Sequence, residues 1–277
     1  MSLDRIRLAS LHDKVISAEE ASAFIEDGMT VGMSGFTRAG EAKAVPLALV
    51  KRAHTNPLKI TLITGASLGN DLDKQLTEAG VLARRLPFQV DNTLRKAINN
   101  GEVMFIDQHL SETVEQMRNL QLKKPDVAII EAVAITEDGG IIPTTSVGNS
   151  ASFAIFAEKV IVEINTNLSP AFEGLHDIYI PTYRPTRQPI PLTQVDERIG
   201  THAINIDPAK IVGIVMNNDL HDSPSTVTAP DDETQGIADH LIAFFEKEVA
   251  EERLPKNLGP LQAGIGSIAN AVLTGLK

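Results

Sequence analysis

Short apolar runs rich in β-branched residues recur along this chain, and segments with helical periodicity separate them. Runs of this kind are typical of strands that are buried on both faces of a sheet. The sequence predicts strands over residues 29–33, 60–64, 103–106, 126–135, 159–164 and 211–216, and helices over 44–53, 72–83, 92–99, 113–122 and 150–157. Strands that alternate with helices favour an α/β fold, in which a mostly parallel sheet is flanked by helices.

Two breaks interrupt this alternation. In the first, near residues 178–200, four prolines forbid a regular helix and disfavour a central strand, so we expect an ordered connection or an edge segment. The second break precedes a strongly amphipathic helix with Pro230 at its start and Asp231, Asp232 and Glu233 near the positive end of its dipole. The apolar positions of that helix are Ile237, Leu241, Phe244, Phe245 and Val249. We therefore place a domain boundary near residues 220–230.

Composition and charge exclude several classes of function. The chain has no cysteine, which rules out disulfides, thiolate metal sites and a cysteine nucleophile. The formal net charge of -11 argues against nucleic acid as a partner. No stretch is apolar enough for a membrane span, so the expected location is cytoplasmic. The seven histidines show no ligand spacing, so no metal is expected.

A glycine-rich turn precedes the last segment of helical spacing. It consists of Gly264, Ile265, Gly266, Ser267 and Ile268. Such a turn presents free backbone N–H groups and the positive end of a helix dipole, and it lets a phosphate or thioester approach the backbone. We interpret it as an anion or acyl-oxygen site. The alternative is a tight loop whose glycines serve only the turn geometry.

A second glycine-bearing turn follows the first predicted strand. Ser34, Gly35 and Phe36 lie where the chain leaves the carboxyl edge of the sheet, which is where open α/β folds bind ligands. Lys43 offers a charge for a phosphate. The alternative is that Phe36 packs in the core and Lys43 is solvated.

Two further loops carry polar groups that suit a small carboxylate ligand. Ser67 follows the second predicted strand, and Thr93 lies beside Arg95 at the start of a predicted helix. A structural interpretation competes at both loops. Asp91 or Asn92 would cap the helix, and Arg95 would be exposed.

Some carboxylates need a separate interpretation. Glu131 and Glu163 fall inside apolar strand runs, where a buried carboxylate is unfavourable unless it is paired or hydrogen-bonded. We expect them to be hydrogen-bonding centres or supports of a site. Ser111 or Thr113 resembles a helix N-cap, so Glu112 complements the helix dipole rather than acting as a nucleophile.

Six segments together carry a family resemblance. They are VGMSGFTRAGEAKAVP, LITGASLG, LRKAINNGEVMFIDQHLSETVEQM, PDVAIIEA, EKVIVEINTNLSPAFEGLHDIYIP and LQAGIGSIANAVLTGL. In this order they resemble the acetyl-CoA hydrolase/transferase family of class I CoA-transferases. The resemblance implies two similar α/β domains with the active site between them, and a homodimer. It also implies that a glutamate attacks the acyl-CoA and then becomes a glutamyl-CoA thioester.

The resemblance also assigns parts of this chain. It implies an N-terminal CoA-transferase domain over 1–225 and the beginning of a second, truncated one over 226–277. Residues 264–268 become the CoA-binding turn, although the family often has asparagine where this chain has Ser267. The nucleophilic glutamate is expected beyond Lys277, so no catalytic residue is assigned here. Coenzyme A is then a substrate rather than a tightly bound cofactor. The partners are an acyl-CoA (acetyl-, propionyl- or succinyl-CoA) and a small carboxylate, and the choice between hydrolase and transferase stays open.

Two alternatives remain at this point. Residues 264–269 satisfy a loose dinucleotide-binding pattern, G-x-G-x-x-A, which would suit an oxidoreductase domain. No convincing strand precedes that turn, and no acidic residue follows at the required spacing. The second alternative is a non-catalytic subunit that docks onto a partner through an apolar face after residue 230.

Overall fold

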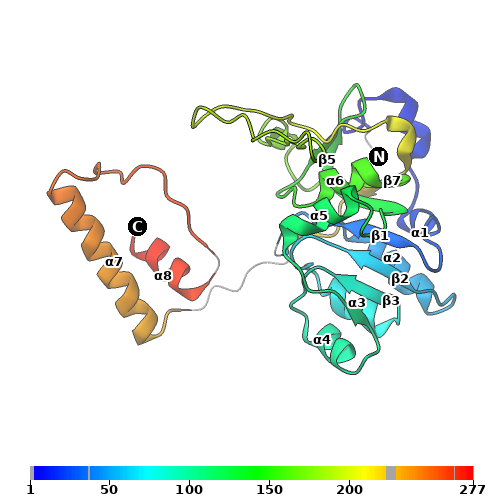
Figure 1. Ribbon diagram of the computed structural model, residues 1–277, viewed down its shortest axis with the longest axis horizontal. Coiled ribbons are helices and arrows are strands. Elements are labelled where there is room, and N and C mark those ends of the chain that lie inside the picture. Colours follow the sequence, from blue (N-terminus) through cyan, green and yellow to red (C-terminus); the bar gives the residue numbers. More distant parts are fainter. Residues whose placement is uncertain (1–2, 37, 223–228, 265, 277) are drawn as a thin grey trace. The chain divides into compact units, whose positions relative to one another are not determined.

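The computed structural model describes residues 3–36, 38–222, 229–264 and 266–276. The chain divides into two compact units, Met1–Ser223 and Pro224–Lys277 (Figure 1). The division falls within the predicted boundary region. That residues 226–277 begin a second CoA-transferase domain stays a prediction.

The first unit is built on one sheet of eight strands with the order β4-β3-β2-β1-β5-β7-β8, and β6 pairs with β5. All neighbouring strands along this path are parallel, and only β6 is antiparallel to its partner. This agrees with the predicted α/β class. The strands are β1 (Thr30–Met33), β2 (Ile60–Ile63), β3 (Leu82–Leu86), β4 (Met104–Phe105), β5 (Val127–Ile135), β6 (Ile141–Pro143), β7 (Lys159–Asn165) and β8 (Ile211–Asn217).

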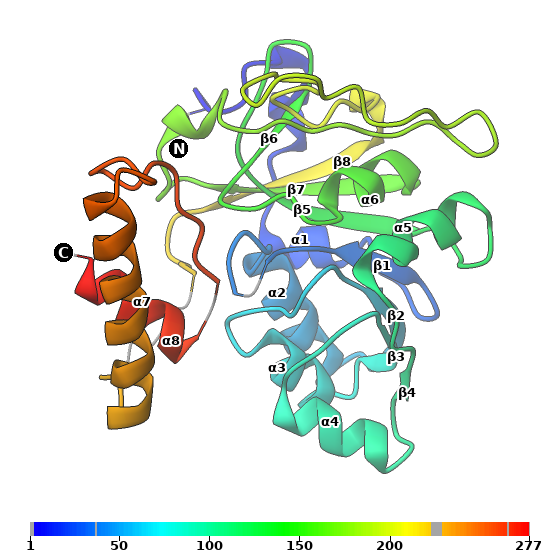
Figure 2. The ribbon, with the colours of Figure 1, turned by 60° about the vertical axis from the view of Figure 1, so that its left-hand side comes forward.

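Helices connect these strands and cover both faces of the sheet (Figure 2). They are η1 (Ala9–Lys14), α1 (Ala18–Ser22), α2 (Ala44–Ala53), α3 (Leu72–Glu78), α4 (Asn92–Asn99), α5 (Leu110–Arg118), α6 (Ser150–Phe156), η2 (Pro170–Phe172) and η3 (Pro208–Lys210). The predicted spans of α2 and α4 agree with the structure at both ends.

Two apolar layers hold the unit together because successive strand residues point to opposite faces. On one face Val127 and Ile129 of β5 pack with residues of α1, α2, α3 and α4. On the other face Ala128 and Ile130 pack with α5, α6 and η1. The central strands β5 and β7 are therefore apolar at most positions and buried almost throughout, as their sequence runs predict.

One predicted helix was too long. The helical pattern predicted over 72–83 ends at Glu78, because Gly80 takes a left-handed conformation (φ 69°) and the chain then enters β3. The sequence LARRL hides this strand, since it places two adjacent arginines in it. Arg85 is nevertheless fully buried, and its guanidinium binds both carboxylate oxygens of Asp73 at 2.9 and 3.0 Å. The short strand β6 was also missed.

The start of α5 differs from the prediction as well. The helix begins at Leu110 with His109 as its N-cap residue, so neither Ser111 nor Thr113 is the N-cap. Thr113 is buried, and its hydroxyl accepts a hydrogen bond from the Gln108 amide nitrogen at 2.7 Å. Glu112 lies in the first turn, where its charge complements the dipole as expected.

The proline-rich stretch forms neither a helix nor a named strand between residues 179 and 200. It begins and ends beside an isolated bridge between Ile178 and Thr201. Ile190, Leu192 and Val195 are exposed along it. The prolines account for this extended course.

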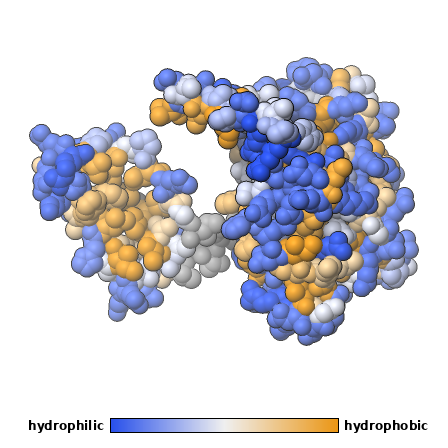
Figure 3. Space-filling model, in the orientation of Figure 1, coloured by the Kyte–Doolittle hydropathy of each residue, from blue (hydrophilic) through white to orange (hydrophobic). Residues whose placement is uncertain are grey.

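The second unit contains two helices in its described residues, α7 (Asp232–Ala250) and α8 (Ser267–Gly275). The Asp231 carboxylate caps α7 by accepting a hydrogen bond from the Thr234 backbone N–H at 2.8 Å. Figure 3 shows apolar residues gathered on one face of this unit. Its exposed large apolar side chains are Ile237, Leu241, Phe244, Leu261, Ile268 and Leu273.

Candidate functional site

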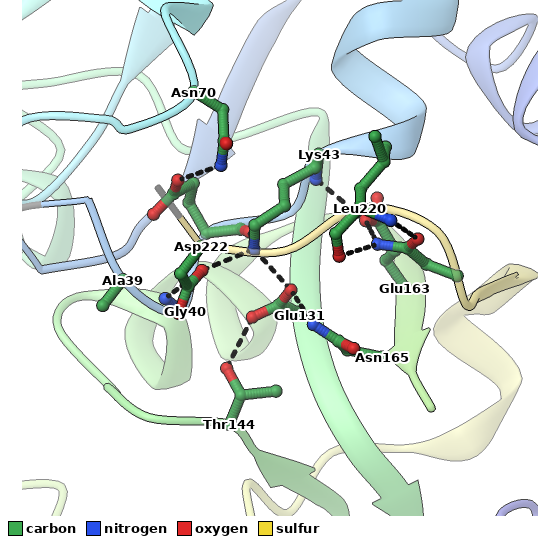
Figure 4. A network of polar contacts seen from close by, with 12 residues as sticks. Ala39, Gly40, Lys43, Asn70, Glu131, Thr144, Glu163, Asn165, Leu220 and Asp222 are labelled. Atoms are coloured by element: carbon green, nitrogen blue, oxygen red, sulfur yellow. Dashed lines mark hydrogen bonds and ion pairs between the residues drawn. The ribbon is translucent and has the colours of Figure 1, made fainter. Parts of the chain in front are cut away.

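A network of buried polar side chains lies near the carboxyl edge of the sheet in the first unit (Figure 4). Glu131 of β5 and Glu163 of β7 are paired in register, so their side chains lie next to each other. Asn165 and Asn217 are paired further along β7 and β8. Residues two apart on a strand share a face, so these groups point the same way. The two glutamates are the hydrogen-bonding centres that the sequence predicts.

Glu163 accepts the first N–H groups of α2. Its carboxylate is within 2.9 Å of the backbone nitrogens of Lys43 and Ala44, and 3.1 Å from that of Val45. The side-chain amide of Asn217 donates a further bond at 3.0 Å. Burial raises the pKa of Glu163, and the three backbone N–H groups oppose that rise. The carboxylate thus caps a helix that begins in a different βα unit.

Lys43 is fully buried with its ammonium held by two carboxylates. Its Nζ is 2.6 Å from Glu131 and 2.8 Å from Asp222, and it donates to the Glu41 carbonyl at 2.7 Å. Burial alone would lower the pKa of Lys43, but Glu131 and Asp222 outweigh it and raise that pKa. Glu131 also accepts bonds from Thr144 at 2.6 Å and Asn165 at 3.0 Å. The alternative that Lys43 is solvated is wrong.

Glu41 is a third buried glutamate, and it lies in the same loop as Lys43. One of its oxygens accepts a hydrogen bond from the Asn70 amide at 3.1 Å, and its Oε2 has no hydrogen-bond partner among the described residues. Burial raises the pKa of Glu41 to about 7, although Lys43 beside it lowers that pKa. At neutral pH a large fraction of Glu41 is therefore protonated.

Two hollows open at this edge, and loops after four neighbouring strands line them. Together they place polar groups and backbone atoms around space at the carboxyl ends of parallel strands, where α/β folds bind ligands. The first, with a volume of about 210 Å³, is lined by Arg38, Leu68, Gly69, Asn70, Asp71, Asp73, Val90, Asp91 and Asn92. The second, of about 590 Å³, is lined by Ala66, Phe88, Asp107, Gln108, His109, Leu110 and Glu112.

The predicted residues of the loop after β1 differ in burial and in what surrounds them. Ser34 is buried, and its hydroxyl accepts a hydrogen bond from the Asn149 backbone N–H at 2.9 Å. Gly35 allows a close approach, because a Cβ there would lie 2.9 Å from the Ala39 carbonyl oxygen. Phe36 is 55% exposed, so the alternative that it packs in the core is wrong. Whether these residues bind substrate stays a prediction.

Ser67 and Thr93 lie near the two hollows. Ser67 is buried between Ala66, which lines the larger hollow, and Leu68, which lines the smaller one. Thr93 is half-buried in the first turn of α4. Asp91 caps that helix by accepting a bond from the Leu94 N–H at 2.8 Å, as one interpretation predicted.

The glycine-rich turn lies in the second unit and is exposed in its described residues. Gly264, Ser267 and Ile268 border a mainly apolar hollow of about 600 Å³. Gly266 has φ 142°, a conformation that favours glycine, and it is the N-cap residue of α8. Ile265 lies outside the described residues. The first N–H groups of α8 have no acceptor within the helix, so they face outward at an accessible position.

Sequence reasoning missed six residues of the buried network, which are Glu41, Asn70, Thr144, Asn165, Asn217 and Asp222. Glu41 was detectable, since it lies two residues before Lys43 in the same turn. Asp222 was not, because it follows β8 and meets Lys43 only through the fold. In the described part of the chain no group of acidic or histidine side chains could hold a metal ion. None of the helices described there is long and apolar enough to cross a membrane.

Comparison with known proteins identifies relatives of this chain independently of its structure. Succinyl-CoA:acetate CoA-transferase of Clostridium kluyveri is 46% identical over 274 residues, which cover 98% of this chain and 51% of the relative. Acetyl-CoA hydrolase of Kluyveromyces lactis is 44% identical over 284 residues, covering 99% of this chain and 54% of the relative. The chain thus spans about half the length of the curated relatives that it matches.

Solved structures share the fold at low sequence identity. RipA from Yersinia pestis has a TM-score of 0.62 and 19% identity, with 100% of this chain and 55% of that chain covered. Glutaconate coenzyme A-transferase from Acidaminococcus fermentans has a TM-score of 0.52 and 15% identity, covering 74% and 76%. A sequence profile of the acetyl-CoA hydrolase/transferase N-terminal domain matches residues 2–216. The chain belongs to the acetyl-CoA hydrolase/transferase family.

Proposed function

We propose that this chain is the CoA-handling N-terminal part of an enzyme that transfers coenzyme A between short acyl groups, or hydrolyses the acyl-CoA. The substrates would be acetyl-, propionyl- or succinyl-CoA and a small carboxylate. The observation that carries the proposal is the match of 98% of the chain, at 46% identity, to a relative named succinyl-CoA:acetate CoA-transferase. A cytoplasmic homodimer stays a prediction.

The arrangement of the first unit is compatible with this chemistry. Two hollows at the carboxyl edge of the sheet offer polar walls for an acyl group and a carboxylate. In the second unit, an exposed glycine-rich turn at a helix N-terminus suits an anionic or thioester oxygen. The dinucleotide-binding alternative loses ground, because no strand precedes the turn in described residues 251–264.

Neither of the two buried strand glutamates is suited to be the attacking carboxylate. Glu131 and Glu163 are buried, and their oxygens are occupied by an ammonium, a hydroxyl, amides and backbone N–H groups. A carboxylate held in this way cannot approach a thioester carbonyl, since a nucleophile needs an open path to the carbon it attacks. The proposed intermediate is a glutamyl-CoA thioester.

The test uses the full gene product that contains this chain. We expect it to exchange CoA between succinyl-CoA and acetate, or to release free CoA from acetyl-CoA. Borohydride added after an acyl-CoA should inactivate the enzyme, because it reduces a glutamyl thioester to an alcohol. The absence of both exchange and hydrolysis across short acyl-CoAs would overturn the proposal.

The glycine turn allows a variant with a matched control. Gly266→Ala places a side chain at a positive φ (142°), which strains the backbone of the turn. We expect the KM for acyl-CoA to rise at least about tenfold as the turn changes shape. Gly259→Ala, also at positive φ (73°) with open space around its Cβ, places a milder backbone strain outside the turn. Equal KM values for the two variants would contradict a binding role for the turn.

A further inference from the structure

A third hollow in the first unit has one charged end and an apolar wall that is interrupted by polar residues. Its volume is about 270 Å³, and it lies between α5, α6 and the segment 177–181. The charged end is formed by Arg118 of α5 and by Arg187 of the proline-rich stretch. The apolar wall consists of Val114, Val147, Ala151, Ile178, Ile180 and Pro181, and the lining also includes Ser111, Ser152, Asp177 and Tyr179.

More positive than negative charge converges at this end. Glu115 accepts a hydrogen bond from Arg118 at 3.0 Å, it forms an ion pair with Arg187 at 3.0 Å, and the Nε of Arg184 is 3.6 Å away from it. One carboxylate thus faces three guanidinium groups. The other carboxylate in the lining, Asp177, is held by the backbone N–H groups of residues 199 and 200 at 3.2 and 2.6 Å.

Arg118 is held in place with donors to spare. Its side chain is only 4% exposed, and its guanidinium lies 5.8 Å from the centre of the Tyr183 ring. Glu115 is its hydrogen-bond acceptor among the described residues, and it engages one of the five N–H groups that a guanidinium carries. None of its nitrogens is among the buried polar atoms that lack a partner, so the remaining N–H groups are accessible to a ligand.

We propose that this hollow binds the phosphate group of an organic ligand. Arg118 and Arg187 would donate to the phosphate oxygens, since guanidinium groups match the geometry of oxyanions. The apolar wall would contact the carbon part of the ligand, which favours an organic phosphate over a free one. If the proposed function holds, the ligand is the nucleotide end of coenzyme A, and only this identification rests on that function.

The binding test compares two arginine variants of the 277-residue chain. Arg187→Gln should weaken the binding of adenosine 3′,5′-bisphosphate about ten- to a hundredfold in calorimetry at low salt. Arg187 is partly exposed, so the variant should fold. Arg84→Gln removes the same charge from an exposed position on β3 and should leave the affinity unchanged. Equal affinities of both variants and wild type would overturn the proposal.

Glu115→Gln separates a ligand site from a purely structural ion pair. Removing the negative charge should tighten bisphosphate binding several-fold, because the guanidinium groups lose their competing carboxylate while the amide oxygen still accepts a bond. A structural role alone predicts a lower Tm with no gain in affinity. Unchanged or weaker binding by the folded variant would therefore count against the site.

Further arms identify the source of the phosphate. If the source is coenzyme A, removal of its 3′-phosphate or the Arg187→Gln change should each weaken CoA binding, with little further loss when combined. If adenosine 3′,5′-bisphosphate needs Arg187 but CoA does not, the hollow is a phosphate site for a separate nucleotide. If acyl exchange occurs while Arg187→Gln binds every phosphate ligand like wild type, the hollow is refuted and the enzymatic function stands. If binding depends on Arg187 but the protein neither transfers CoA nor hydrolyses acyl-CoA, the phosphate site stands and the enzymatic function is refuted.

Discussion

Lys43 and the carboxyl groups around it illustrate how a single residue depends on distant partners. One ammonium is buried together with Glu41, Glu131 and Glu163, and with the partly exposed Asp222. One positive charge cannot compensate four negative ones at low dielectric, so at least one carboxyl group must hold a proton. Glu41, with its pKa raised to about 7, is best placed to do so.

Glu41→Gln should change how stability depends on pH. The pKa of Glu41 is 4.5 when unperturbed and about 7 when folded, so the native state binds more protons than the unfolded state between these values. Wild-type stability therefore falls as pH rises from 4.5 through 7, by up to about 3 kcal/mol from this group. The variant should lack that part of the fall. Urea unfolding at pH 5 to 8 measures it, with Glu158→Gln as an exposed control. Parallel pH profiles of wild type and Glu41→Gln would refute the prediction.

Lys43→Met should destabilise the first unit by about 3–5 kcal/mol, because it leaves Glu131 buried without its counter-charge. Lys43→Met combined with Glu131→Leu should recover part of that loss, since the fully buried carboxylate is removed and the remaining partner of Lys43, Asp222, is partly exposed. Lys51→Met on the exposed face of α2 serves as the control. The urea midpoint should be highest for the control, lower for the double variant and lowest for the single variant. A single variant as stable as the control would show that the buried pair contributes nothing.

At the scale of elements, close contact between β1 and α6 sets the spacing of the sheet and its covering helix. Gly32 lies in the centre of β1 against the buried Phe153 of α6. A Cβ at this glycine would be 2.8 Å from Cγ and 3.0 Å from Cβ of Phe153, near the backbone of the helix, where little movement is possible. Because Gly32 has no side chain, α6 can pack close to β1. This helix follows the 144–149 loop at the sheet edge.

Gly32→Ala should therefore destabilise the first unit by about 1–3 kcal/mol through overpacking. Gly236→Ala in α7 is the matched control, because nothing lies within 4 Å of its Cβ and alanine favours a helix by about 0.5–1 kcal/mol. The free energy of unfolding measured with denaturant should therefore fall for Gly32→Ala and rise for Gly236→Ala. A Gly32→Ala protein as stable as wild type would mean that the helix yields at little cost.

At the scale of the whole chain, the two units differ in how much surface they bury. The strands β5 and β7 are buried almost throughout, whereas α7 and α8 expose many of their apolar residues. A small unit buries too little apolar area to be stable by a wide margin. The second unit should therefore open more easily than the first.

Hydrogen exchange followed by mass spectrometry measures this difference directly. Amides of β5 and β7 should exchange only through global unfolding of the first unit, and amides of α7 and α8 should exchange at least about a hundredfold faster at neutral pH. Addition of CoA should slow exchange near residues 264–268 if the glycine turn binds it. Equal protection in both units would contradict the prediction.

The sequence by itself determined the α/β class, the apolar strands, the spans of α2 and α4, and the family, because these depend on local periodicity, capping residues and short segments in a fixed order. It also singled out Glu131 and Glu163 as carboxylates that need partners. Only the tertiary structure decided who those partners are. The bond from Lys43 to Glu131 spans 88 residues, and the one from the Lys43 N–H to Glu163 spans 120. Such contacts follow from strand order and register, and no local pattern contains that information.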